Sequence, residues 1–125
     1  VGGPVDLVVA DLSFISLTLV LPALVRSATS DADLVPMVKP QFEVGKDRVG
    51  AGGVVSDPLL RVDAVRGVAR RAAELNWHAV AVTASPLPGP AGNVEYFLHL
   101  RAQTDPMPPD VFEAVVHQAV EEGPQ

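Results

Sequence analysis

The sequence predicts an α/β fold in which a mostly parallel sheet, with an antiparallel last strand, carries helices on both faces. Short valine-rich runs alternate along the chain with segments of helical periodicity, which is the pattern of strands joined by helices. The last two apolar runs have no helix between them, which favours an antiparallel pair. Hydrophobic residues make up 48% of the 125 residues, enough for the core of one domain.

The expected elements are, in order, a strand, a helix, a strand, a helix, two strands and a helix. The clearest helix begins at Asp57-Pro58, because aspartate caps helices and proline suits the first helical position. Ser13 or Ser16 would cap the first helix, in which Pro22 predicts a kink or a late start. A glycine-rich loop is expected over 41–56, and loops of this length are often functional. The expected ranges of the elements are 5–10, 17–28, 33–38, 57–76, 77–83, 93–101 and 110–122.

Composition and charge exclude several classes of protein. The absence of cysteine rules out disulfides, thiolate zinc sites and a cysteine nucleophile, and the three histidines lack ligand spacing, so no metal site is expected. A net charge of -6 and a pI near 4.8 make the whole chain a poor binder of polyanions. No secretory signal is visible, and the longest uncharged apolar stretch, residues 12–25, is too short to span a bilayer. We therefore expect a soluble, cytoplasmic protein with no membrane partner.

Three charged residues, Asp11, Lys39 and Glu95, end or interrupt apolar runs. Asp11 and Lys39 follow two expected parallel strands, and ligands bind beyond the carboxyl ends of such strands. A lysine flanked by two carboxylates is held in one orientation, and it can then position a hydroxyl group and help remove its proton. The residues alone leave other interpretations open: Asp11 as a helix cap, Lys39 as a strand-end lysine in solvent, and Glu95 on a solvent-facing strand.

Four segments, in order along the chain, resemble the TlyA family of FtsJ-like proteins. They are residues 6–16, 37–43, 49–58 and 84–97. The active site of FtsJ-like enzymes is a Lys-Asp-Lys-Glu tetrad, and Asp11, Lys39 and Glu95 match its last three members. The resemblance implies a partial Rossmann-like methyltransferase sheet, with residues 1–125 as the C-terminal portion of the domain. The first lysine, the glycine-rich cofactor loop and an N-terminal S4-like RNA-binding domain have no counterpart in this sequence.

The reaction implied by the resemblance is methyl transfer from S-adenosylmethionine to a ribose 2'-hydroxyl of ribosomal RNA, at a cytidine. Lys39 would orient that hydroxyl and help deprotonate it, while Asp11 and Glu95 hold the lysines. Ribosomal RNA and ribosomal subunits are the implied partners, and the chain by itself is expected to be inactive. Two alternatives stay open: a catalytically inactive RNA- or ribosome-binding fragment, and a membrane-acting haemolysin, which the absence of a spanning segment disfavours.

Further candidates are less specific. Leu12, Ser13 and Phe14 adjoin the first carboxylate and are candidates to edge the cofactor site, although they equally suit the start of a helix. Lys46 and Arg48 are candidates for RNA phosphate contacts, but nearby acidic residues favour a solvated loop. Four arginines of the central helix are expected to form an exposed face: Arg61, Arg66, Arg70 and Arg71.

Overall fold

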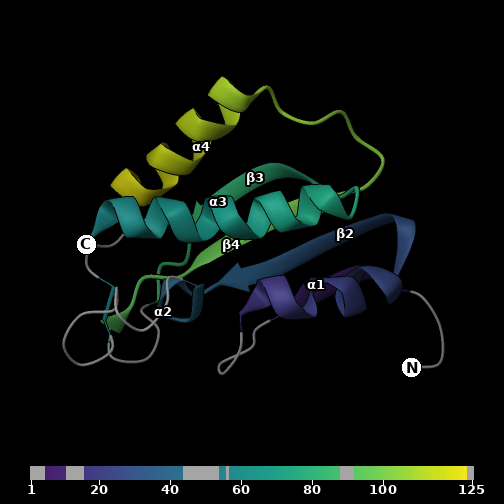
Figure 1. Ribbon diagram of the computed structural model, residues 1–125, viewed down its shortest axis with the longest axis horizontal. Coiled ribbons are helices and arrows are strands. Elements are labelled where there is room, and N and C mark those ends of the chain that lie inside the picture. Colours follow the sequence, from purple (N-terminus) through teal and green to yellow (C-terminus); the bar gives the residue numbers. More distant parts are fainter. Residues whose placement is uncertain (1–4, 11–15, 44–53, 56, 88–91, 124–125) are drawn as a thin grey trace.

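The computed structural model describes residues 5–10, 16–43, 54–55, 57–87 and 92–123, which form a sheet and a layer of helices (Figure 1). The strands are β1 (Val5–Ala10), β2 (Ala28–Val38), β3 (His78–Ala84) and β4 (Tyr96–Arg101). The helices are α1 (Leu17–Arg26), α2 (Pro40–Glu43), α3 (Pro58–Glu74) and α4 (Pro109–Glu122). The α/β class expected from the sequence is confirmed.

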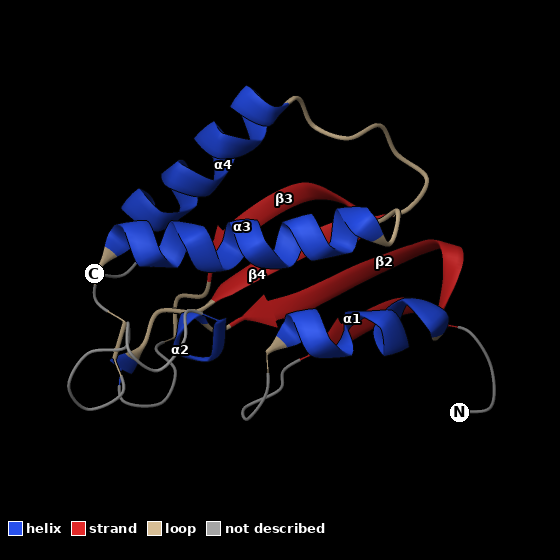
Figure 2. Ribbon diagram, in the orientation of Figure 1, coloured by secondary structure: helices blue, strands red, loops and turns tan. Residues whose placement is uncertain are grey.

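The described strands lie in the order β1-β2-β4-β3, so the last strand is inserted between the second and the third (Figure 2). β1 pairs with β2 in parallel, whereas β4 is antiparallel to both β2 and β3. The antiparallel last strand is as expected, but its insertion makes the ladders on both of its sides antiparallel. A mostly parallel sheet is therefore not confirmed.

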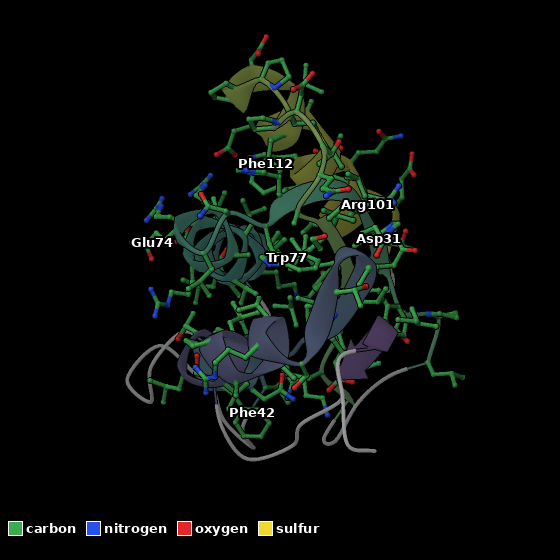
Figure 3. All side chains as sticks on the ribbon, turned by 90° about the vertical axis from the view of Figure 1, so that its right-hand side faces the viewer. Asp31, Phe42, Glu74, Trp77, Arg101 and Phe112 are labelled. Atoms are coloured by element: carbon green, nitrogen blue, oxygen red, sulfur yellow. The ribbon has the colours of Figure 1, made fainter. Side chains whose placement is uncertain are left out.

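The helices α1 and α3 lie on the same side of the sheet, and α4 packs against α3 and the edge strand β3 (Figure 3). Both α1 and α3 lead from one strand to the next in the same direction across the sheet, and right-handed crossovers then place both helices on one face. The expected helices on both faces are not found among the described helices. On the opposite face Met37, Phe97 and His99 are half-buried, and Leu7 is 57% exposed.

Local sequence explains where two helices begin. The Asp57 side chain accepts a hydrogen bond of 2.9 Å from the Leu59 amide and so caps α3, as expected. Ser16 is the cap of α1, where its hydroxyl accepts a bond of 3.2 Å from the Thr18 amide. The helix continues through Pro22.

No described helix has both the length and the apolar character needed to cross a membrane.

The core lies between the sheet and the helices on its covered face. Tyr96, Leu98 and Leu100 alternate along β4 with residues of the other face, and all three are fully buried. They pack in one cluster with apolar side chains of α1, β2 and α3. This alternation fixes the register of β4, because a slip by one residue would exchange its two faces. The register decides which residues meet at the end of the β2–β4 ladder.

Candidate active site

Lys39 and Glu95 lie opposite each other, one position beyond the end of the β2–β4 ladder. Val38 and Tyr96 form the last residue pair of this antiparallel ladder, and Lys39 and Glu95 are the next residue on each segment. Each of the two charged residues is only 5% exposed. The interpretations that place Lys39 in solvent and Glu95 on a solvent-facing strand are therefore wrong.

The first carboxylate candidate, Asp11, lies outside the described residues. β1 runs parallel to β2 and ends at Ala10, which pairs with Pro36 near the end of β2. The carboxyl ends of these two strands therefore lie at the same edge of the sheet, where the chain also enters β4. The other candidates outside the described residues are Leu12, Ser13, Phe14, Lys46 and Arg48.

Hydrogen bonds hold Glu95 through both its backbone and its side chain. Its carbonyl oxygen accepts a bond of 2.8 Å from the amide of Ser85, the residue that follows β3. Its Oε2 accepts a bond of 3.2 Å from Nε2 of Gln41, on α2. The buried carboxylate is thus tied to the turn that carries Lys39, which comes two residues before Gln41.

Two buried side chains bind the peptide groups of Val55. Asn93 Oδ1 accepts a bond of 2.8 Å from the Val55 amide, and Arg61 Nε donates a bond of 3.1 Å to the Val55 carbonyl. Arg61 is 5% exposed, so its expected place on an exposed helix face is wrong. Burial raises the pKa of Tyr96, and the nearby Arg61 guanidinium opposes the shift without reaching the geometry of a hydrogen bond.

Glu43 joins the other end of this turn to the first helix. Its carboxylate accepts a bond of 2.5 Å from the Ser16 hydroxyl and one of 2.8 Å from the Leu17 amide, both at the N-terminus of α1. Burial raises the pKa of Glu43, while the bonds from Ser16 and Leu17 partly offset this shift. The short helix α2 therefore contacts α1 through Glu43 and the buried Glu95 through Gln41.

Comparison with known proteins identifies the family of this chain. A family model described as FtsJ-like methyltransferase matches residues 1–102. The chain belongs to this family. The resemblance drawn from the sequence motifs is thus confirmed, whereas the assignment of Lys39 and Glu95 to the family's tetrad stays a prediction.

Three relatives set the scale of the similarity. A Mycobacterium tuberculosis protein named 16S/23S rRNA (cytidine-2'-O)-methyltransferase TlyA is 67% identical over 125 residues, which cover 99% of this chain and 47% of that protein. Hemolysin A of Brachyspira hyodysenteriae is 32% identical over 94 residues, or 75% of this chain and 39% of that protein. The solved structure named "Putative hemolysin from Streptococcus thermophilus" has a TM-score of 0.83 and 33% identity over 96% of this chain and 44% of that one. The chain spans about half the length of these relatives, or less.

A cavity elsewhere in this FtsJ-like chain is distinct from the strand-end site. It has a volume of about 710 Å³ and lies between β3 and α4, where Thr83, Val115 and Gln118 are among its lining residues. Neither Lys39 nor Glu95 lines it. We place the candidate chemistry at the strand ends, because buried charged groups converge there, whereas Glu122 is the one charged side chain among the described residues that line this cavity.

Four residues that shape the site were not predicted from the sequence: Gln41, Glu43, Arg61 and Asn93. Arg61 carried a usable signal, since its spacing from Val65 is that of one helix face. The contact of Gln41 with Glu95 depends on the ladder between β2 and β4, and Asn93 binds Val55, which is 38 residues away in the sequence. No local pattern specifies either contact.

Proposed function

We propose that this chain carries the proton-handling residues of an enzyme that methylates ribosomal RNA at a ribose 2'-hydroxyl of cytidine. The observation that supports the proposal most strongly is the burial of Lys39 and Glu95, which adjoin across the end of the β2–β4 ladder. The relative with 67% identity, named for the same reaction, adds to it. Ribosomal RNA and ribosomal subunits would be the partners, and such substrates would place the protein in the cytoplasm.

The chemistry of the site suits the methyl donor S-adenosylmethionine. This donor would supply an electrophilic methyl group on a cationic sulfonium. Carboxylates such as Glu95 favour a nearby positive charge, and the carboxyl ends of β1 and β2 are the usual place for a ligand in sheets of this kind. We propose Asp11, together with Leu12, Ser13 and Phe14, as residues near the donor.

The chain's own residues would act on the attacking hydroxyl. Lys39 would hold the 2'-oxygen by a hydrogen bond. As the oxygen bonds to the methyl carbon, the donor's methyl–sulfur bond would break, and the hydroxyl proton would leave by way of the Lys39 amino group to water. Glu95 and Asp11 would orient Lys39, because a buried ammonium group is placed by the carboxylates that pair with it. Methyl transfer needs close, in-line approach of the reacting atoms, so fixing Lys39 would contribute much of the rate.

RNA binding would need more positive charge than this chain supplies. The chain has nine lysines and arginines against fifteen acidic residues, and affinity for phosphate backbones comes mainly from basic side chains. Lys46 and Arg48 are the proposed local contacts. We propose that most of the affinity for RNA comes from an S4-like domain of the kind that the family resemblance implies.

The substitution Lys39→Ala in the full-length gene product tests the proposed function. We expect methyl incorporation into ribosomal RNA to be lost, while binding of S-adenosylmethionine, measured by calorimetry, persists. Arg70→Ala is the matched control, because Arg70 is an exposed cation on α3. Near-normal incorporation by the Lys39 variant would refute the role assigned to this lysine.

Membrane lysis is the second candidate, because one relative is named Hemolysin A. The two functions differ in what they require: methyl transfer needs RNA and a methyl donor, whereas lysis needs only a lipid bilayer. Leakage of a dye from liposomes, without RNA or donor, would favour lysis. A wild-type protein that binds ribosomes but never transfers methyl groups would instead favour an inactive binding protein.

A further inference from the structure

Gln41 contacts the buried carboxylate that the proposed reaction uses. It lies on α2, two residues after Lys39, and its Nε2 donates a hydrogen bond of 3.2 Å to Oε2 of Glu95. We propose that Gln41 is a positioning residue that fixes the Glu95 carboxylate relative to Lys39. This inference rests on the proposed function, because it assigns Gln41 a part in the same site.

The orientation of the Gln41 amide supports this role. Its Oε1 is buried and accepts no hydrogen bond within the described part of the chain. A buried acceptor without a partner is unfavourable, so some other contact must hold the amide in this orientation. The bond to Glu95 does so, because a carboxylate accepts hydrogen bonds only and would repel the amide oxygen if the group were reversed.

The turn that carries Gln41 is itself held in place. The Phe42 amide donates a bond of 2.9 Å to the carbonyl of Lys39, which closes the turn between the two residues. At its far end, Glu43 accepts two bonds from the N-terminus of α1. Gln41 therefore projects from a fixed piece of backbone, and its bond to Glu95 limits how far that carboxylate can move from Lys39.

Other contacts hold the main chain of Glu95 in place. The Ser85 amide binds the Glu95 carbonyl at 2.8 Å, and Tyr96, the next residue, is fully buried within β4. These contacts set the position of the main chain, but they do not by themselves set the side-chain torsions of Glu95. Gln41 supplies a hydrogen bond to the carboxylate group itself.

Two substitutions of similar size separate this role from simple packing. Gln41→Met and Gln41→Glu both keep the approximate volume of the side chain. Methionine cannot donate a hydrogen bond to Glu95, and an ionised glutamate cannot donate one either and places two carboxylates in contact. In the full-length gene product we expect kcat to fall about ten- to a hundred-fold in both variants, with KM for RNA and for S-adenosylmethionine little changed. Gln103→Met, at an exposed amide after β4, is the control and should keep the wild-type kcat.

A second measurement does not depend on turnover. In NMR spectra, the side-chain NH₂ signals of Gln41 should shift when Glu95 is replaced by alanine, whereas those of Gln103 should stay in place. Unchanged Gln41 signals, or wild-type kcat in both Gln41 variants of an active enzyme, would overturn the inference alone. A wild-type protein without methyl transfer, in which the Gln41 signals still respond, would overturn the proposed function and leave the contact established.

Discussion

Asn93 offers a quantitative test of the buried contacts around the strand ends. Its Oδ1 accepts a bond of 2.8 Å from the Val55 amide, and Asn93 is only 2% exposed. Asn93→Leu keeps the approximate size of the side chain but leaves the Val55 N–H buried without that partner. An unpaired buried donor costs about 1–3 kcal/mol in the free energy of unfolding.

This cost translates into a measurable fall in the unfolding temperature. An entropy of unfolding of roughly 2.1 cal/mol/K per residue gives about 0.26 kcal/mol/K for 125 residues, so each kcal/mol lowers the midpoint by about 4 °C. We therefore expect Asn93→Leu to lower the thermal midpoint, followed by circular dichroism, by about 4–12 °C. Gln103→Leu, which removes an exposed amide, should lower it by no more than about 2 °C. Equal midpoints for the two variants would refute the reasoning.

Three further predictions concern stability. Burial raises the pKa of Glu43, so the folded chain binds the carboxyl proton more tightly than the unfolded chain does. The free energy of unfolding should therefore fall as pH rises through the raised pKa. Glu43→Gln should flatten this part of the stability–pH curve, measured by urea unfolding. Gly123→Ala should lower the unfolding midpoint, because the new Cβ would lie 2.6 Å from Cβ of Ala84. Gly67→Ala should raise the midpoint by the equivalent of about 1 kcal/mol, because alanine improves helix propensity in α3 and, apart from the adjoining helix backbone and chain neighbours, no atom of the described residues lies within 4 Å of the new Cβ. A lower midpoint for this variant would contradict the packing.

The elements with strong local signals were predictable from sequence. The helix at Asp57-Pro58 has a capping residue, a proline at its first position and apolar residues at helical spacing, and the structure ends it at Glu74, within two residues of the expected end at 76. β2 was predicted to begin at 33, but it begins at Ala28. Its first residues have a polar sequence, and pairing of Ala28 with Val5 in β1 makes them extended. Tertiary pairing there outweighs local propensity.

The strand order was the main feature that local patterns did not specify. The sequence suggested that β4 pairs with β3, and it does, but nothing in the pattern showed that β4 also pairs with β2. That second ladder brings Glu95 next to Lys39 and within reach of Gln41. The family motifs predicted Lys39 and Glu95 as site residues. The residues that support them, such as Asn93, were recognised only from the structure.

The central claim is that Lys39, Glu95 and Asp11 act together on one ribose hydroxyl at the edge of the sheet. The most direct measurement is a crystal structure of the full-length gene product with an S-adenosylmethionine analogue. We predict that the Lys39 Nζ atom lies within about 4 Å of a carboxylate oxygen of Glu95 or Asp11, the range of an ion pair, and faces the donor. A structure in which the three side chains point to separate surfaces, beyond mutual contact, would contradict the account.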